Sequence, residues 1–169
     1  MRIVPISPAF AAGIVTWRYS PPYDCYDMTG VKPEFLLDPE NGYYALLEAD
    51  ELIGYRLFGP DGQVPGGRYD SSALDTGGGL RPDLTGRGLG RQAVATGLAF
   101  GRERFAPGAF RVTVAGFNVR AQRVMRAAGF RYLETFAAAT DGREYQILLR
   151  QERESLSRPA NEPTTPVRP

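Results

Sequence analysis

Histidine is absent from this chain of 169 residues, and cysteine and lysine each occur once. Without histidine, the chain has no serine–histidine triad, no histidine base and few ways to build a zinc site. The single Cys25 excludes an intrachain disulfide and a cysteine metal cluster. The single lysine, Lys32, precedes Pro33, so the chain has no Gly-Lys-Ser/Thr phosphate loop. These absences predict chemistry that uses no metal.

Long hydrophobic runs are also missing. No stretch approaches the ~18 consecutive apolar residues that a membrane helix needs. The opening Met1–Pro5 lacks the apolar block of a secretory signal, so we expect a cytoplasmic protein with no membrane partner. The length and the 43% hydrophobic content fit one globular domain over residues 1–151. Residues 152–169, rich in proline, are expected to form a disordered tail.

The net charge of +1 conceals two unlike halves. Residues 1–70 carry ten acidic against five basic residues, whereas residues 71–150 carry six acidic against twelve basic ones. A basic half suits an anionic ligand and an acidic half suits a cationic one, although two solvated faces could simply differ. The arginines form no dense run and the pI is 7.8, so nucleic acid is not expected as a partner.

Hydrophobic periodicity and turn residues predict the elements along the chain. Ser7 and Pro8 are a typical helix start, and Asn118 and Gly129 bracket another helix. Strands are expected over 2–7, 42–49, 51–58, 71–80, 110–115, 130–138 and 143–151, and helices over 8–16, 33–37, 88–105 and 118–128. This order predicts an α+β fold with a mixed sheet. Inside the third helix, Gly97 and Gly101 predict close backbone packing on that sheet.

The most informative segment, Leu80–Arg91, joins a strand to a helix and contains Gly86, Gly88 and Gly90. Alternating glycines let successive N–H groups converge at the positive end of a helix dipole, which suits a phosphate or pyrophosphate. Tight turns use glycine even where nothing binds, so this signal is weak by itself. The dinucleotide fingerprint G-x-G-x-x-G does not fit, because the third glycine comes one place early.

Together with a second motif, this loop resembles the GNAT superfamily of N-acetyltransferases. The acetyl-CoA loop of that family, Gln/Arg-x-x-Gly-x-Gly/Ala after Pro-Asp, is matched by Pro82-Asp83 and Thr85–Gly90. The later Asn-x-x-Ala and Gly-Phe pattern is matched by Asn118–Ala121 and by Gly129-Phe130. The resemblance implies the acyl-CoA N-acyltransferase fold, a three-layer α/β arrangement with a mixed, mostly antiparallel sheet of about six or seven strands. It also implies acetyl-CoA as donor and an amine acceptor.

The resemblance assigns the cofactor site residue by residue. Main-chain N–H groups of the loop would hold the pyrophosphate, and the preceding strand end would pair with the pantetheine arm, where glycines also permit a bulge that opens the sheet. Asn118 can contact the pantetheine or the acceptor, or act only as a helix cap. The predicted cofactor-binding residues are Gly78, Gly79, Leu80, Gly86, Arg87, Gly88, Leu89, Gly90, Arg91 and Asn118.

Two departures from the family pattern concern the loop and the mechanism. Thr85 replaces the usual Gln or Arg, which costs little if backbone groups hold the pyrophosphate. Met125 stands where many members place a tyrosine general acid, and methionine has no proton to give a departing thiolate. Another group, or water, must then serve, or the thiolate leaves unassisted.

The attacking amine must lose a proton, because an alkyl ammonium has a pKa of about 10.4. The family uses a carboxylate of the fourth or fifth strand, and the fourth strand offers Asp75, with Glu48 on the preceding hairpin as a second candidate. Asp75 could equally be a residue exposed on an edge or a turn. An N–H group near Leu80 would meet the thioester oxyanion.

The segment Trp17–Met28 lies where the family places an acceptor-lining loop, and its aromatic rings could bind a cation or merely cover the core. The leading hypothesis is an acetyl-CoA-dependent N-acetyltransferase acting by direct transfer. The alternatives are a non-catalytic CoA-binding or protein-interaction domain and a phosphate-binding hydrolase or kinase-like domain. A homodimer is possible, since the superfamily commonly pairs through its C-terminal strands.

Overall fold

The computed structural model describes residues 1–152, which form one seven-stranded sheet in the order β1-β2-β3-β4-β5-β7-β6. Neighbouring strands are antiparallel except β4 and β5, which confirms the predicted mixed, mostly antiparallel sheet. The predicted tail lies, from residue 153 onward, outside the described residues. The strands are β1 (Arg2–Pro5), β2 (Tyr43–Glu48), β3 (Glu51–Phe58), β4 (Leu74–Leu80), β5 (Ala109–Ala115), β6 (Arg131–Ala137) and β7 (Glu144–Gln151).

The helices begin and end close to the predicted residues. Ser7 caps the first helix by accepting a hydrogen bond from the Phe10 amide. The third helix begins two residues later than predicted, because Gly88 has a φ of +83° that a right-handed helix does not accommodate. None of the helices within residues 1–152 is long and apolar enough to cross a bilayer. They are α1 (Pro8–Ile14), α2 (Pro33–Leu37), α3 (Gly90–Phe105) and α4 (Val119–Ala127).

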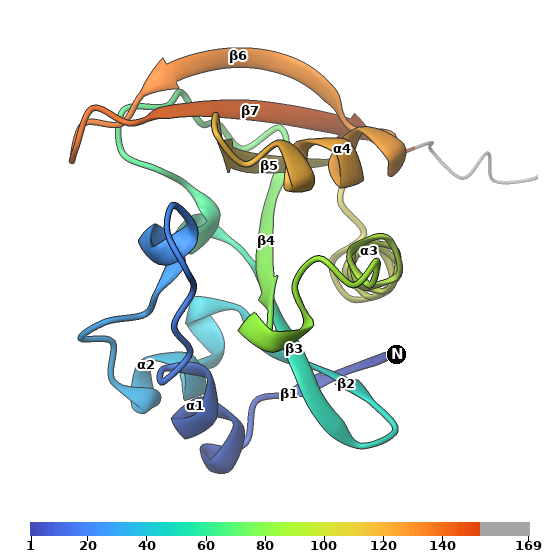
Figure 1. Cartoon of the computed structure of the whole chain (residues 1–169). Coiled ribbons are helices and arrows are strands. Elements are labelled where there is room, and N and C mark those ends of the chain that lie inside the picture. The colour runs from blue at the N-terminus through green and yellow to red at the C-terminus, as the bar shows by residue number, and fades with distance from the viewer. Residues whose placement is uncertain (153–169) are drawn as a thin grey trace, which may run out of the picture.

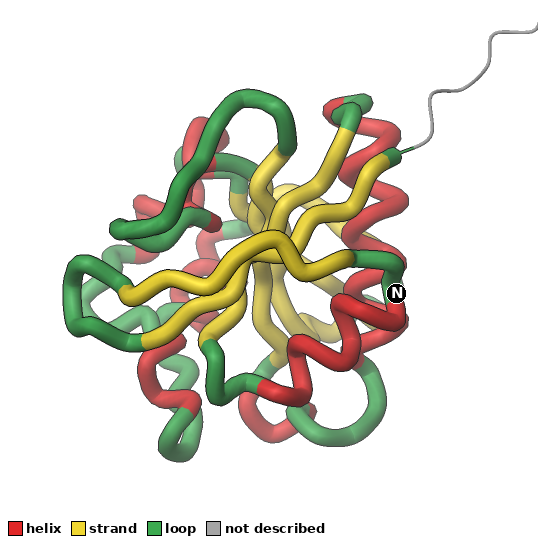
Figure 2. The backbone as a smooth tube through the Cα atoms, turned by 90° about the horizontal axis from the view of Figure 1, so that it is seen from above, coloured by secondary structure: helices red, strands yellow, loops and turns green. Residues whose placement is uncertain are grey.

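Helices cover both faces of the sheet (Figures 1 and 2). On one face α1 and α2 pack in a cluster built around Ala11, Ile14 and Leu36. On the other face α3 and α4 share a cluster centred on Phe110, which is fully buried. These three layers bear out the fold that the family resemblance implied.

The sheet opens between β4 and β5. These parallel strands pair only at Leu74–Phe110 and Asp75–Arg111, after which they separate. In Figure 1, β5, β6 and β7 lie at the top, β1–β3 lie at the bottom, and β4 runs between the two parts. The register of β4 on β3 continues unshifted from Thr76 to Leu80, so the bulge expected from the β4 glycines is not what separates the strands. The opening instead follows from the early end of the β4–β5 ladder.

The two glycines inside α3 lie against the sheet, as predicted. A Cβ atom at Gly97 would lie 2.7 Å from Arg56 Nε, and one at Gly101 would lie 2.8 Å from the ring of Phe110. Side chains of any size would therefore push α3 away from β3 and β5. Because α3 begins at the glycine-rich loop, this close packing also fixes where that loop stands.

We predict that Gly101→Ala lowers the free energy of unfolding by about 1–3 kcal/mol, because overpacking against Phe110 outweighs the better helix propensity of alanine. Urea denaturation measures the change. Gly108→Ala is the control, because nothing lies within 4 Å of a Cβ there. Equal stability of the Gly101 variant and the wild type would contradict the packing described above.

Candidate active site at the opening of the sheet

The edge of β4 that faces the opening carries main-chain groups with no strand partner. The Asp75 carbonyl accepts from Gly59 N–H, and Arg81 N–H donates to the Ile53 carbonyl, so both residues direct these groups toward β3. Because backbone groups alternate along a strand, the N–H and C=O groups of Gly78 and Leu80 point away from β3, toward the opening. This edge can pair with an extended arm such as pantetheine, as an added strand would.

The opposite edge of the opening belongs to β5. Gly116 N–H donates to the Glu144 carbonyl of β7, so the alternation turns the amide of Ala115 away from β7 and toward β4. Gly79 of β4 and Ala115 of β5 each lie four residues beyond the Asp75–Arg111 pair, past the end of the β4–β5 ladder. The two strand ends therefore present backbone groups without strand partners to one shared space.

The glycine-rich loop leads from this space into α3. Gly86 and Gly88 have φ values of +77° and +83°, which side-chain-bearing residues adopt only with strain. A Cβ atom at Gly88 would meet nothing within 4 Å, so the loop leaves open room above it. The sixteen-residue α3 begins at Gly90 and adds the positive end of its dipole. This geometry suits a pyrophosphate, and the residue-level assignment of Gly86–Arg91 stays a prediction.

A cationic side chain borders the same loop. A Cβ at Gly86 would lie 3.4 Å from Nη1 of Arg120, the second residue of α4. The guanidinium of Arg120 lies over the ring of Tyr23, 4.2 Å from its centroid, and its Nε donates to the Tyr23 hydroxyl. Arg120 is thus held beside the loop, where a phosphate would find a positive charge.

Asn118 acts as a helix cap, and its amide also has a second contact. Its Oδ1 accepts from the Ala121 amide at 3.0 Å, which confirms the capping role. Its Nδ2 donates to the hydroxyl of Tyr26 at 3.2 Å. The side-chain amide of Asn118 therefore caps α4 with its oxygen and contacts the aromatic loop, Trp17–Met28, with its nitrogen. Contact of Asn118 with pantetheine stays a prediction.

Met125 lies in the hydrophobic core rather than at the opening. It is 8% exposed and packs in the cluster that contains Val112, Val114 and Phe130. The departure from the family pattern is therefore complete at this position, because neither the chemistry nor the location of this side chain suits proton donation.

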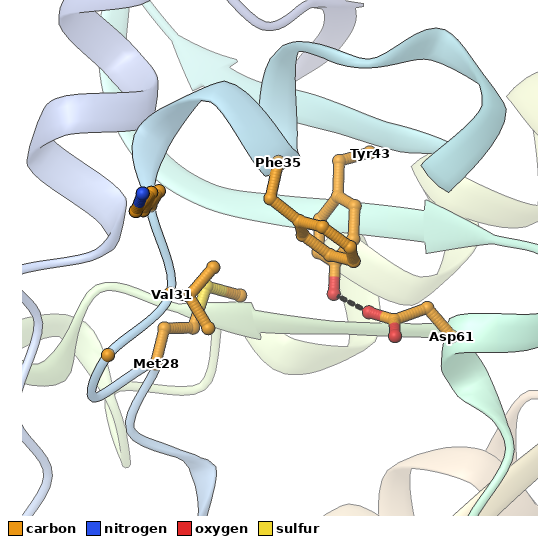
Figure 3. A pocket seen from close by; sticks show the side chains of 7 residues that line it. Met28, Val31, Phe35, Tyr43 and Asp61 are labelled. Carbon is orange, nitrogen blue, oxygen red and sulfur yellow. Dashed lines mark hydrogen bonds between the residues drawn. The ribbon is translucent and has the colours of Figure 1, made fainter.

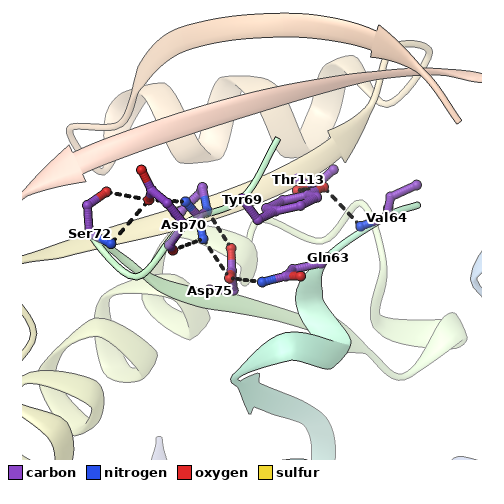
Figure 4. A network of polar contacts seen from close by, with 8 residues as sticks. Gln63, Val64, Tyr69, Asp70, Ser72, Asp75 and Thr113 are labelled. Atoms are coloured by element: carbon purple, nitrogen blue, oxygen red, sulfur yellow. Dashed lines mark hydrogen bonds and ion pairs between the residues drawn. The ribbon is translucent and has the colours of Figure 1, made fainter. Parts of the chain in front are cut away.

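Asp75 is buried in a polar network at the point where β4 and β5 last pair (Figure 4). Its carboxylate accepts from Arg111 Nε at 2.7 Å and Arg111 Nη2 at 2.9 Å. Gln63 Nε2 donates to it at 2.8 Å. Arg111 also donates to Asp70 and lies 5.0 Å from the centroid of the Tyr69 ring. Asp75 raises the pKa of Arg111, because its carboxylate accepts hydrogen bonds from the guanidinium.

This arrangement does not favour the predicted catalytic role of Asp75. Both carboxylate oxygens are engaged by Arg111, so taking a proton from an amine would break a bidentate ion pair. The interpretation of Asp75 as a residue exposed on an edge or a turn is wrong, since it is 5% exposed. The second candidate, Glu48, is exposed at the end of β2, in the hairpin that leads to β3.

Arg56 is a feature that sequence analysis missed. It is 4% exposed between β4 and α3, and within the described residues its side chain makes one hydrogen bond, to Thr76 at 3.2 Å. Its Nε is buried without a partner, and its Nη1 would lie 3.0 Å from a Cβ at Gly78. Burial lowers the pKa of Arg56 to about 10, so the side chain stays cationic at neutral pH. In the sequence, the signal that could have indicated a buried role for Arg56 was its position as a charged residue within an apolar strand.

The aromatic loop contacts the opening as well as the core. Trp17 and Met28 pack with α1 and α2, as expected of residues that cover a core. The Tyr19 hydroxyl instead donates to the Leu80 carbonyl at 2.8 Å. Tyr26 reaches Asn118 on the other side of the opening. The core-covering role is therefore confirmed for Trp17 and Met28. Binding of a cation by the rings of this segment stays a prediction.

We predict that Gly88→Trp raises the Kd for CoA at least about tenfold, because the indole would fill the open room above the loop. Isothermal calorimetry measures this. Gly142→Trp is the matched control, since Gly142 also has a positive φ, of +71°, and nothing within 4 Å of a Cβ. Unchanged affinity in the Gly88 variant would mean that the phosphates bind elsewhere.

We predict that Asp75→Asn lowers the free energy of unfolding by about 3 kcal/mol, because it leaves the buried Arg111 with only the exposed carboxylate of Asp70 as a counter-charge. Asp70→Asn should change it by less than about 1 kcal/mol, since the Asp70 side chain is 71% exposed. Chemical denaturation compares the two. Unchanged stability, with activity lost selectively at low pH, would show that Asp75 is a base.

Comparison with known proteins places this geometry in a family. The family model described as "Acetyltransferase (GNAT) family" matches residues 12–130. The search of curated proteins found no match. Within the described residues, no group of three or more His, Cys, Asp or Glu side chains could hold a metal ion.

Several solved structures share the fold. The aminoglycoside acetyltransferase AAC(6')-Ib, in complex with ribostamycin and coenzyme A, has a TM-score of 0.70 at 15% identity, covering 89% of this chain and 92% of that one. A spermidine N-acetyltransferase chimera of Vibrio cholerae SpeG and hSSAT has a TM-score of 0.68 at 12% identity, covering 89% and 96%. A ribosomal-protein-alanine N-acetyltransferase from Brucella melitensis has a TM-score of 0.66 at 14% identity, covering 90% and 100%.

The family match spans more than two thirds of the chain and includes both motifs, the opening between β4 and β5 and the glycine loop. The chain belongs to the acetyltransferase (GNAT) family and is an acyltransferase that uses acetyl-CoA as its acetyl donor.

Proposed function

We propose that this enzyme acetylates a primary amine whose carrier bears a second positive charge, by direct attack of the amine on acetyl-CoA. The observation that supports this proposal most is a pocket on the α1/α2 face of the sheet (Figure 3). The pocket has a volume of about 460 Å³ and is lined by Met28, Gly30, Val31, Lys32, Phe35, Tyr43 and Asp61. Aromatic faces beside a carboxylate suit an ammonium group.

The carboxylate of this pocket is held in place by a tyrosine. The Tyr43 hydroxyl donates to Asp61 Oδ2, and the ring of Phe35 meets Tyr43 edge to face at a centroid distance of 6.0 Å. Burial and the Asp61 carboxylate raise the pKa of Tyr43, so the phenol stays neutral. Lys32 is the one cation among the lining residues.

A row of aromatic rings runs from the pocket to the opening of the sheet. Tyr43 lies 5.8 Å from Tyr55, ring to ring, and Tyr55 lies against Gly79 on β4. Strands β2 and β4 are two strand spacings apart, which is about 10 Å. An acceptor with its reacting amine at the opening and a second cation near Asp61 would span this distance.

The chemistry at the opening would rest mainly on alignment. The free N–H of Gly78 or Leu80 would meet the developing oxyanion, and the cation of Arg56 lies behind Gly78 to favour the same charge. Holding amine and thioester together supplies most of the rate. With Asp75 engaged by Arg111, we propose that the amine loses its proton to solvent rather than to this carboxylate.

Two of the similar structures are named for acceptors that carry several amines, ribostamycin with an aminoglycoside acetyltransferase and spermidine with its acetyltransferase. These names favour a polycationic acceptor and a catalytic role over a non-catalytic binding domain. The predicted cytoplasmic location and homodimer stay predictions.

We predict that diamines and polyamines release CoA thiol from acetyl-CoA faster than monoamines of equal length do. Asp61→Asn should raise the KM for such acceptors about three- to tenfold, and Lys32→Ala should lower it, because the two charges act in opposite directions on a bound cation. Steady-state kinetics with a thiol reagent measures both.

If none of the amines in the panel causes release of CoA thiol, although acetyl-CoA binds tightly, a non-catalytic domain would be favoured. A lower KM with Asp61→Asn and a higher KM with Lys32→Ala, the reverse of the expected changes, would mean that the pocket accepts an anion.

A further inference from the structure

The CoA thiolate that leaves during acetyl transfer lacks the proton donor that the family pattern would place at residue 125. Met125 is a core residue, and it cannot donate a proton. A side-chain donor would therefore have to come from another element that reaches the opening between β4 and β5. Two hydroxyls of the aromatic loop reach it, those of Tyr19 and Tyr26.

The two hydroxyls differ in whether their proton is already used. The Tyr19 hydroxyl donates its proton to the Leu80 carbonyl at 2.8 Å. The Tyr26 hydroxyl instead accepts, from Asn118 Nδ2 at 3.2 Å. Within residues 1–152 no acceptor takes the Tyr26 proton in a hydrogen bond. Tyr26 is thus the hydroxyl of this pair whose proton can be given away.

Tyr26 is also held at the β5 edge of the opening. Its ring packs on Phe117 at a centroid distance of 6.3 Å, and its hydroxyl lies by the cap of α4. The Tyr26 hydroxyl also has a hydrogen bond with the main chain of Ala115, the last residue of β5, at the edge that faces β4. An arm laid along the free edge of β4 at Gly78–Leu80 would pass between these two sides.

The protonation state fits a donor. Burial raises the pKa of Tyr26 above its ordinary value, while hydrogen bonds with Asn118 and the Ala115 backbone act in the opposite direction. The phenol is therefore protonated throughout the neutral range. Its partner Asn118 is itself fixed by capping α4, so the hydroxyl has a defined direction.

We propose that Tyr26 is the general acid of the reaction and protonates the sulfur of CoA as the thioester bond breaks. The proposal rests on the proposed direct transfer. The amine nitrogen forms the new C–N bond, the C–S electron pair goes to sulfur, and sulfur takes the Tyr26 proton. The proton lost by the amine then returns to the phenolate through solvent, so that amide and free thiol are the only products.

The test combines kinetics with a binding measurement that needs no turnover. We expect Tyr26→Phe to lower kcat about ten- to a hundredfold, with the KM for acetyl-CoA and for the amine changed less than about threefold. Tyr132→Phe is the control, because Tyr132 is 56% exposed on β6 and should leave kcat unchanged. Calorimetry then compares CoA with desulfo-CoA, which lacks the sulfur atom. Wild-type protein should bind CoA roughly fivefold more tightly, and Tyr26→Phe should remove that preference.

Several results would overturn the proposal. Equal affinity of the wild type for CoA and desulfo-CoA would overturn it, and this comparison holds even if the Tyr26→Phe variant does not fold. A higher KM for the amine with unchanged kcat would assign Tyr26 to the acceptor site instead. Failure of the wild type to bind acetyl-CoA at all would contradict the proposed function itself, which is a separate outcome.

Discussion

The ion pair between Asp75 and Arg111 is the interaction on which the site depends, because it lies where the two parts of the sheet last touch. Both residues are at most 5% exposed, and two hydrogen bonds of 2.7 and 2.9 Å join them. Beyond this pair the ladder between β4 and β5 ends and the strands separate. A bidentate pair fixes geometry better than a single contact would. We infer that it sets both the position and the angle of the opening.

An opened sheet leaves backbone groups without partners, and burying them unpaired would be costly. Here the loop before α2 supplies partners from side chains: Tyr19 meets Leu80 on β4, and Tyr26 lies at the β5 side beside Asn118. One segment therefore spans both edges of the gap. A segment placed in this way can order the site and also contribute chemistry to it.

The sequence predicted most of the fold, because its signals are local. Helix caps at Ser7 and Asn118 and the alternating strand runs placed nearly every element within a few residues. Gly97 and Gly101 even indicated the packing of α3 on the sheet. The motif around Gly86–Gly90 indicated the donor, since a phosphate loop is built from consecutive residues.

The side-chain contacts around the opening were harder to predict, because they join distant segments. Whether Asp75 is a free base or an ion-pair partner depends on Arg111, 36 residues away. The contact between Tyr26 and Asn118 spans 92 residues, and no local pattern reports it. Arg56 shows the same limit, since its burial depends on both β4 and α3.

The central claim is that the gap between β4 and β5 seats the acetyl donor. A crystal structure of the protein with bound CoA tests it most directly. The account predicts the pyrophosphate on the N–H groups of Gly86–Arg91, with the pantetheine hydrogen-bonded to the free edge of β4 at Gly78 and Leu80. Density for CoA at another surface, or a gap closed by side chains in the complex, would contradict it.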